Sequence, residues 1–203
     1  MPRGIHIAAV LCLILSGVTG MFAASEASSL TNFSELRERA STERLNLLGD
    51  PAVEERFILA QLSALEPMRD SRILTLGALA IACAFTFVAA GRMLRPAGLP
   101  REGMRRMLGG VAIIAAILRT IDGAQWMVVV KRSSTAMAEA MSTLPQFQDP
   151  TFAQQLKSTV PILMSAITLA QTAVIAGAFV LIGQYFHSAR VREAITAQDG
   201  PAE

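Results

Sequence analysis

The sequence has few of the residues from which catalytic and metal sites are usually built. Its 203 residues include two histidines, two cysteines, one tryptophan and one tyrosine, and only 17% of them are charged. The two cysteines, Cys12 and Cys83, form no Cys-x-x-Cys pair, which disfavours dithiol redox chemistry. A phosphate-binding glycine loop, a zinc-ligand spacing and a Gly-x-Ser-x-Gly nucleophile motif are also missing. We therefore predict no enzyme activity, no cofactor, no metal and no nucleic-acid partner.

Long apolar runs are what the sequence does contain. Hydrophobic residues make up 52% of the chain, and the mean hydropathy is +0.45. Four runs, 5–24, 73–91, 107–130 and 160–186, are each long enough for the about 20 helical residues that cross a bilayer. The alternating pattern of β-barrel strands is absent. The sequence predicts an all-α membrane protein with four transmembrane helices in an up-down-up-down bundle, forming a single polytopic domain with a polar tail over 187–203.

The first apolar run has two interpretations. Residues 1–25 combine one early arginine, an apolar centre and small residues near the end, as a secretory signal peptide does. The apolar stretch nevertheless runs to about 20 residues rather than 7–15, which favours a retained transmembrane helix. With either interpretation, the segment that begins at residue 26 lies outside the cytoplasm.

The density of arginine predicts the orientation. The segment 92–106 holds five arginines, whereas 25–72 spreads six over a longer stretch and carries nine acids. Basic loops stay in the cytoplasm, so we place 92–106 and both termini there. Sixteen of the eighteen basic residues are arginine, which is typical of GC-rich bacterial genomes. The predicted location is the inner membrane of a bacterium.

The two remaining connections are predicted to form helical hairpins outside the membrane, over 31–66 and 131–158. Asn32 has the character of a helix N-cap, and a second helix is expected to begin at Asp50–Pro51 because proline suits the first helical position. The second connection extends the third transmembrane helix, turns, and begins again at Asp149–Pro150.

Two opposite charges, Arg119 and Asp122, interrupt the third apolar run. Each costs about 2.5–3.5 kcal/mol at the centre of a bilayer. Residues three apart share a helix face, so we predict an intramembrane salt bridge between the two, with Gln125 extending the same face. If the third and fourth helices are antiparallel, matching depths places Asp122 beside Thr168 and Arg119 beside Gln171 or Thr172, which completes the predicted polar cluster.

This cluster has a functional and a structural interpretation. Ionisable residues inside a membrane often mark a path for ions, protons or substrate. The structural interpretation is a salt bridge that fixes the helix register, and it is favoured because Asp122 already has a basic neighbour and no second acid lies at that depth. The predicted function is that of an accessory, assembly or structural membrane protein, acting through helix–helix contacts with a protein partner or a second copy. The alternative is a small oligomeric transporter or channel with Arg119 and Asp122 in its path.

The rarer side chains are assigned structural roles. His6 and His187 fall at the ends of the first and fourth apolar runs, where the headgroup region explains them better than metal binding does. Met137 and Met141 share a helix face, and we expect them to pack rather than to bind copper. Trp126, Tyr185 and Phe186 are typical of aromatic belts at the membrane surface.

Overall fold

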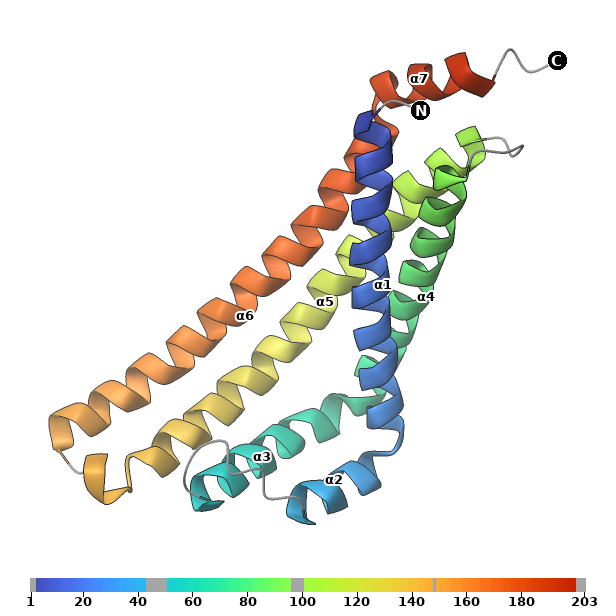
Figure 1. Cartoon of the computed structure of the whole chain (residues 1–203). Helices are drawn as coiled ribbons and strands as arrows, with labels where there is room; N and C mark the ends of the chain where they lie inside the picture. The colour runs from blue at the N-terminus through green and yellow to red at the C-terminus, as the bar shows by residue number, and fades with distance from the viewer. Residues whose placement is uncertain (1–2, 43–50, 96–100, 148, 200–203) are drawn as a thin grey trace. The chain divides into compact units, whose positions relative to one another are not determined.

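The computed structural model describes residues 3–42, 51–95, 101–147 and 149–199, and this part of the chain is helical throughout apart from short turns, with no strand. Four of its helices are long and apolar enough to cross a membrane, as the sequence predicted (Figure 1). The four predicted apolar runs lie, in order, within these helices: α1 (Arg3–Thr31), α4 (Arg69–Leu94), α5 (Arg101–Met141) and α6 (Pro150–His187).

Two short helices separate α1 from α4. Helix α2 spans Phe33–Thr42 and α3 spans Pro51–Leu65, so the predicted helix start at Pro51 is confirmed. The rest of the first predicted helix, 43–48, lies outside the described residues. A single turn of 3-10 helix, η1 (Glu66–Met68), contains Pro67 and leads directly into α4.

The second predicted hairpin is built from continuations of the long helices. Helix α5 runs without a break from the apolar run to Met141, and α6 begins at Pro150 before its own apolar run. Between them lies η2 (Pro145–Phe147). The N–H of Thr151 donates to Oδ1 of Asp149 at 2.9 Å, so the aspartate caps α6 as the sequence indicated.

The contacts within the chain divide it into two compact units, which are described separately. Unit 1 comprises 1–26, 75–120 and 173–203, and unit 2 comprises 27–74 and 121–172. The four long helices, α1, α4, α5 and α6, each contribute to both units. Whether the chain acts as a single domain stays a prediction.

The core of unit 1 joins the beginnings of two helices to the ends of two others. The start of α1 and the start of α5 meet the ends of α4 and α6 and one face of α7 (Ala189–Asp199) (Figure 1). The predicted polar tail, 187–203, contains helix α7, which buries two apolar residues one turn apart. The buried members of this core are Ile5, Ala9, Cys12, Ala89, Ala90, Met93, Leu108, Phe186, Val191 and Ile195.

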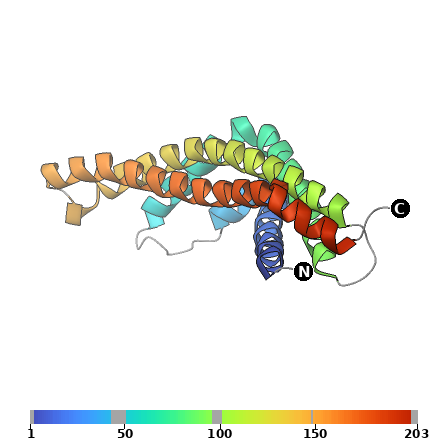
Figure 2. The same ribbon diagram turned by 90° about the horizontal axis from the view of Figure 1, so that it is seen from above.

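Unit 2 has a smaller core between α3 and α5. Val53 of α3 is buried against Met137 and Ala140 of α5, and Met141 packs at its edge. Both methionines therefore serve packing, as the sequence predicted. In each unit α5 and α6 run side by side (Figure 2).

Candidate functional site

The most distinctive polar feature of unit 2 is a buried ion pair between α4 and α5. Nη2 of Arg72 lies 3.0 Å from Oδ1 of Asp122, and the two side chains are only 1% and 2% exposed. Nη1 of Arg72 also donates to the backbone carbonyl of Asp122 at 3.5 Å. One arginine thus contacts both the side chain and the main chain of the aspartate, and the pair carries no net charge.

Neighbouring side chains on the same two helices extend this contact. The guanidinium of Arg72 lies 5.1 Å from the ring centre of Trp126, which follows Asp122 by one turn. An arginine at this distance is attracted to the indole face by about 0.5–2 kcal/mol. Nε2 of Gln125 donates to Oγ of Ser71 at 2.9 Å. The first turn of α4 and the middle of α5 are therefore joined by charge, by a hydrogen bond and by an aromatic contact. We call Arg72, Asp122, Trp126, Gln125 and Ser71 the α4–α5 cluster.

Helix α6 approaches α5 beside this cluster, and a glycine makes the approach possible. A Cβ atom added to Gly123 would overlap the side chain of Thr172. Thr172 and Thr168 are both buried, and Oγ1 of Thr168 donates to the carbonyl of Met164 on its own helix at 2.9 Å. Gln171 is exposed.

The register of α5 and α6 therefore differs from the one expected from matching depths. That expectation placed Asp122 beside Thr168 and Thr172 beside Arg119, whereas Thr172 lies against Gly123. The shift amounts to more than one helical turn, and it brings one of the predicted threonines against Gly123, the residue that follows Asp122. This register places Thr172 where only a glycine leaves room for it.

Sequence reasoning named Asp122 but missed Arg72. Arg72 was counted with the outer segment because it is the last residue before the second apolar run. Its position at the end of an apolar run was the available signal, since an arginine there can turn inward to reach an acid on a neighbouring helix. Arg119 is half-buried on α5, one turn before Asp122, and belongs to unit 1. Its pairing with Asp122 stays a prediction.

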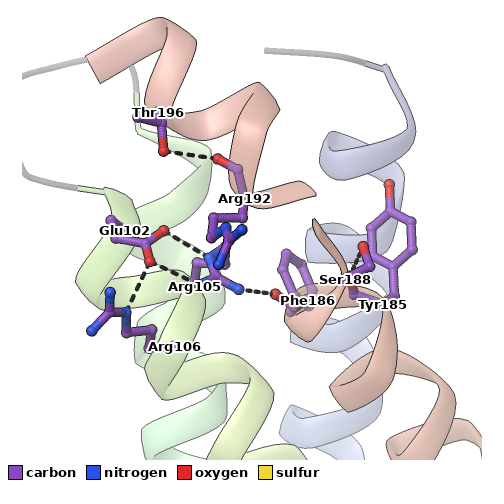
Figure 3. A network of polar contacts seen from close by, with 8 residues as sticks. All are labelled: Glu102, Arg105, Arg106, Tyr185, Phe186, Ser188, Arg192 and Thr196. Carbon is purple, nitrogen blue, oxygen red and sulfur yellow. Dashed lines mark hydrogen bonds and ion pairs between the residues drawn. The ribbon is translucent and has the colours of Figure 1, made fainter. Parts of the chain in front are cut away.

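A second polar network lies in unit 1, where α5 begins (Figure 3). Glu102 accepts hydrogen bonds from Nε and Nη2 of Arg105, both at 2.7 Å, and from Nε of Arg106 at 2.8 Å. Nη1 of Arg105 donates to the carbonyl of Phe186 at 2.5 Å. Carbonyls in the last turn of a helix have no partner within it, so Arg105 caps the end of α6. Arg105 is buried, and all of these bonds hold it in place.

The two arginines change the titration of Glu102, which precedes the apolar run of α5. Hydrogen bonds from Arg105, followed by those from Arg106 and the charges of both, lower the pKa of Glu102 from 4.5 to about 2, against the opposing effect of burial. The carboxylate in turn raises the pKa of Arg105. Glu102 is therefore ionised at any physiological pH.

We expect the stabilising effect of Glu102 to depend on pH in the acid range alone. Because folding depresses its pKa, its contribution is complete above pH 4.5 and disappears as the pH falls towards 2. The melting temperature in detergent should differ between the parent and Glu102→Gln by a constant amount from pH 5 to 8, and the gap should close between pH 4.5 and 2. Glu193→Gln, which removes the same charge from the exposed side of α7, is the matched control and should leave the melting temperature at pH 7 close to that of the parent. A gap that closed near pH 6 would contradict this assignment.

The histidines and cysteines are the other rare side chains of the described ranges. No group of three or more His, Cys, Asp or Glu residues is placed there to hold a metal. Cys12 and Cys83 are both buried free thiols. Nδ1 of His187 lies 2.9 Å from the carbonyl of Gly183, one turn earlier on α6, and its ring lies against Gly109.

Comparisons with known proteins add no functional information. No protein-family model matches the chain, and neither a curated protein nor a solved structure is found to be similar to it. The chemistry of the α4–α5 cluster is therefore the remaining guide to the function of the chain. It has one acid, neutralised by one arginine, and its observed contacts join two helices.

Proposed function

We propose that this chain is a multi-pass membrane protein with an accessory, assembly or structural role, and that it acts through contacts between helices and with other proteins. The observation that carries the proposal is the Arg72–Asp122 ion pair. Both side chains are almost completely buried and oriented towards one another. Such a pair fixes the position of one helix on another, whereas a residue on a transport path must be reached from outside.

The surface of the long helices supports a location in a membrane. Helix α1 exposes Ile7, Leu11, Ile14 and Val18, which follow one another at intervals of about one turn. Exposed apolar side chains also line α4, α5 and α6. Apolar stripes on four helices of this length suit hydrocarbon better than water.

The core of unit 1 supports the up-down-up-down arrangement. It gathers the starts of α1 and α5 together with the ends of α4 and α6, which is the pattern that four antiparallel neighbours produce. We propose that this end, with 92–106 and both termini, faces the cytoplasm of a bacterium and that α2 and α3 face outward. A protein partner or a second copy would then meet the chain within the bilayer or at its outer surface.

Measurement of ion flux tests the structural role against the alternative of transport. In sealed vesicles we expect the parent protein to conduct protons and small ions no faster than lipid alone. Asp122→Asn should leave this background unchanged. A flux in the parent that Asp122→Asn abolished, with the variant still folded, would replace the structural role with a pathway.

Reporter fusions test the orientation. An alkaline phosphatase fused at residue 146 should be active, and one fused at residue 98 should be inactive, because the enzyme folds only after export. A cytoplasmic reporter such as green fluorescent protein should give the opposite pattern at the two sites. An exported reporter at residue 98 would reverse the proposed topology.

A further inference from the structure

We propose that the arginine-rich end of unit 1 binds the headgroups of anionic glycerophospholipids and that α7 supplies the exposed part of this site. The inference rests on the proposed membrane location and adds a specific lipid partner to it. The segments 1–24, 92–106 and 187–203 at this end carry eight arginines and four acids, Glu102, Glu193, Asp199 and Glu203. We define the arginine-rich end by its eight arginines: Arg3, Arg92, Arg95, Arg101, Arg105, Arg106, Arg190 and Arg192.

The network around Glu102 leaves positive charge at the surface. One carboxylate is shared by two guanidinium groups, so the three side chains together carry a surplus positive charge. Arg105 is buried and directs its remaining nitrogen to the carbonyl of Phe186. Arg106 bonds to Glu102 through Nε, and its side chain is 73% exposed. Arg105 therefore holds the network together, while Arg106 presents charge to a ligand (Figure 3).

Helix α7 is anchored so that its arginines face outward. Val191 and Ile195 are buried in the core of unit 1, whereas Arg190 and Arg192 are exposed. The apolar face of α7 is consequently occupied by the protein and is not free to enter a bilayer. The exposed charges described on α7 are those of Arg190, Arg192 and Glu193, which leave a net positive charge, and an anionic group is the complementary partner.

Apolar surface next to the arginines favours a lipid over another polyanion. On α1 the exposed Ile7 follows Arg3 by one turn, and on α4 the exposed Val88 precedes Arg92 by one turn. Near the end of α6, Leu181 is exposed, and the Tyr185 hydroxyl lies 3.1 Å from the position of a Cβ on Gly4. A tyrosine in this position is typical of the headgroup level. A glycerophospholipid joins an acyl chain to a phosphate, whereas an acidic protein or a nucleic acid would leave the apolar side chains uncovered.

The expected strength follows from the attraction of basic residues to an anionic membrane surface. Each arginine near such a surface strengthens binding about fivefold. Removing Arg190 and Arg192 together should therefore weaken binding by roughly 25-fold. Because both side chains are exposed, the melting temperature of the variant should match that of the parent.

Native mass spectrometry of the full chain in neutral detergent measures this binding. The protein is titrated with phosphatidylglycerol or with phosphatidylcholine of the same acyl chains, and the bound lipids are counted. We expect the parent to prefer phosphatidylglycerol, Arg190→Gln/Arg192→Gln to lose the preference, and the matched variant Lys131→Gln/Arg132→Gln to keep it. The control removes the same charge from exposed positions on α5 in unit 2.

Three results would overturn the proposal. Equal binding of the two lipids by the parent would show that the protein does not recognise an anionic headgroup. Equal losses of the preference for phosphatidylglycerol in the two double variants would indicate a general effect of the protein's charge. Displacement of phosphatidylglycerol by an equal concentration of inorganic phosphate would show that the site binds a free anion and not a lipid. The reporter fusions test the orientation separately from the lipid site, because an inverted topology would leave the lipid preference in detergent unchanged.

Discussion

Replacing Arg72 with methionine should lower the free energy of unfolding by about 3–5 kcal/mol, because it leaves the carboxylate of Asp122 buried without its arginine. Asp122→Leu should cost a similar amount for the converse reason. In a chain of this length a loss of that size lowers the melting temperature by roughly 10 °C. Thermal unfolding in mild detergent, followed by circular dichroism, measures both variants.

The double variant Arg72→Met/Asp122→Leu should recover most of this loss. Apolar side chains can replace a buried ion pair at little cost once neither charge is left alone, although the contact of Arg72 with Trp126 is also lost. The matched control is the adjacent pair Arg69 and Asp70, which lie 3.7 Å apart with side chains 42% and 94% exposed. The same substitutions there should change stability by less than about 1 kcal/mol. Additive losses in the double variant at 72 and 122 would show that the two residues are not coupled.

A second double-mutant cycle, which combines Arg119→Leu with Asp122→Leu, tests the pair that the sequence predicted. If Arg119 stabilises Asp122, then Arg119→Leu/Asp122→Leu should be more stable than the sum of its single variants. Comparing the two coupling energies ranks the arginines as partners of the aspartate. We expect the larger value for Arg72, because it contacts both the carboxylate and the backbone carbonyl of Asp122.

Gly123→Leu should prevent the close packing of α5 and α6 in unit 2 and abolish the folded protein at 37 °C. Even the single Cβ of alanine would overlap Thr172, so Gly123→Ala should already cost about 1–3 kcal/mol. The expected loss is large because the backbone of α5 lies against the threonine, and neither helix can withdraw without losing the contacts around it.

Gly110→Ala is the matched control, since it lies on the same helix with nothing within 4 Å of an added Cβ. Alanine favours the helix over glycine by about 1 kcal/mol at both positions, so the control should be as stable as the parent or more so. Thr172→Ala should partly rescue Gly123→Ala by removing the nearest side-chain atoms. Equal melting temperatures for the two glycine variants would mean that Thr172 does not lie against Gly123.

The sequence predicted the elements better than it predicted their contacts. Apolar run lengths located the four long helices, and local rules located the start of α3 at Pro51 and the cap at Asp149. Such signals lie within a few residues of the feature that they determine. Helix α7 was not predicted, because the segment is polar on average. Two apolar residues one turn apart are nevertheless enough to bury one of its faces.

The partner of Asp122 could not be found by the same reasoning. Spacing along one helix identifies neighbours on that helix, which is why Arg119 was named. Arg72 is 50 residues away in sequence, and only the packing of α4 on α5 brings it to the aspartate. The register of α6 was missed for a related reason. It depends on where side chains fit against Gly123, which polarity and depth do not reveal.

Arg72 precedes Asp122 along the chain, so the ribosome completes the helix of the arginine before it makes the helix of the aspartate. During synthesis at a translocon, α5 would therefore meet its counter-charge already in place. A chain in which α4 followed α5 would have to insert the aspartate before Arg72 was made, and a charge at the centre of a bilayer costs about 2.5–3.5 kcal/mol. In the proposed membrane location, the order of the two helices would make Arg72 available to this acid as soon as α5 is inserted.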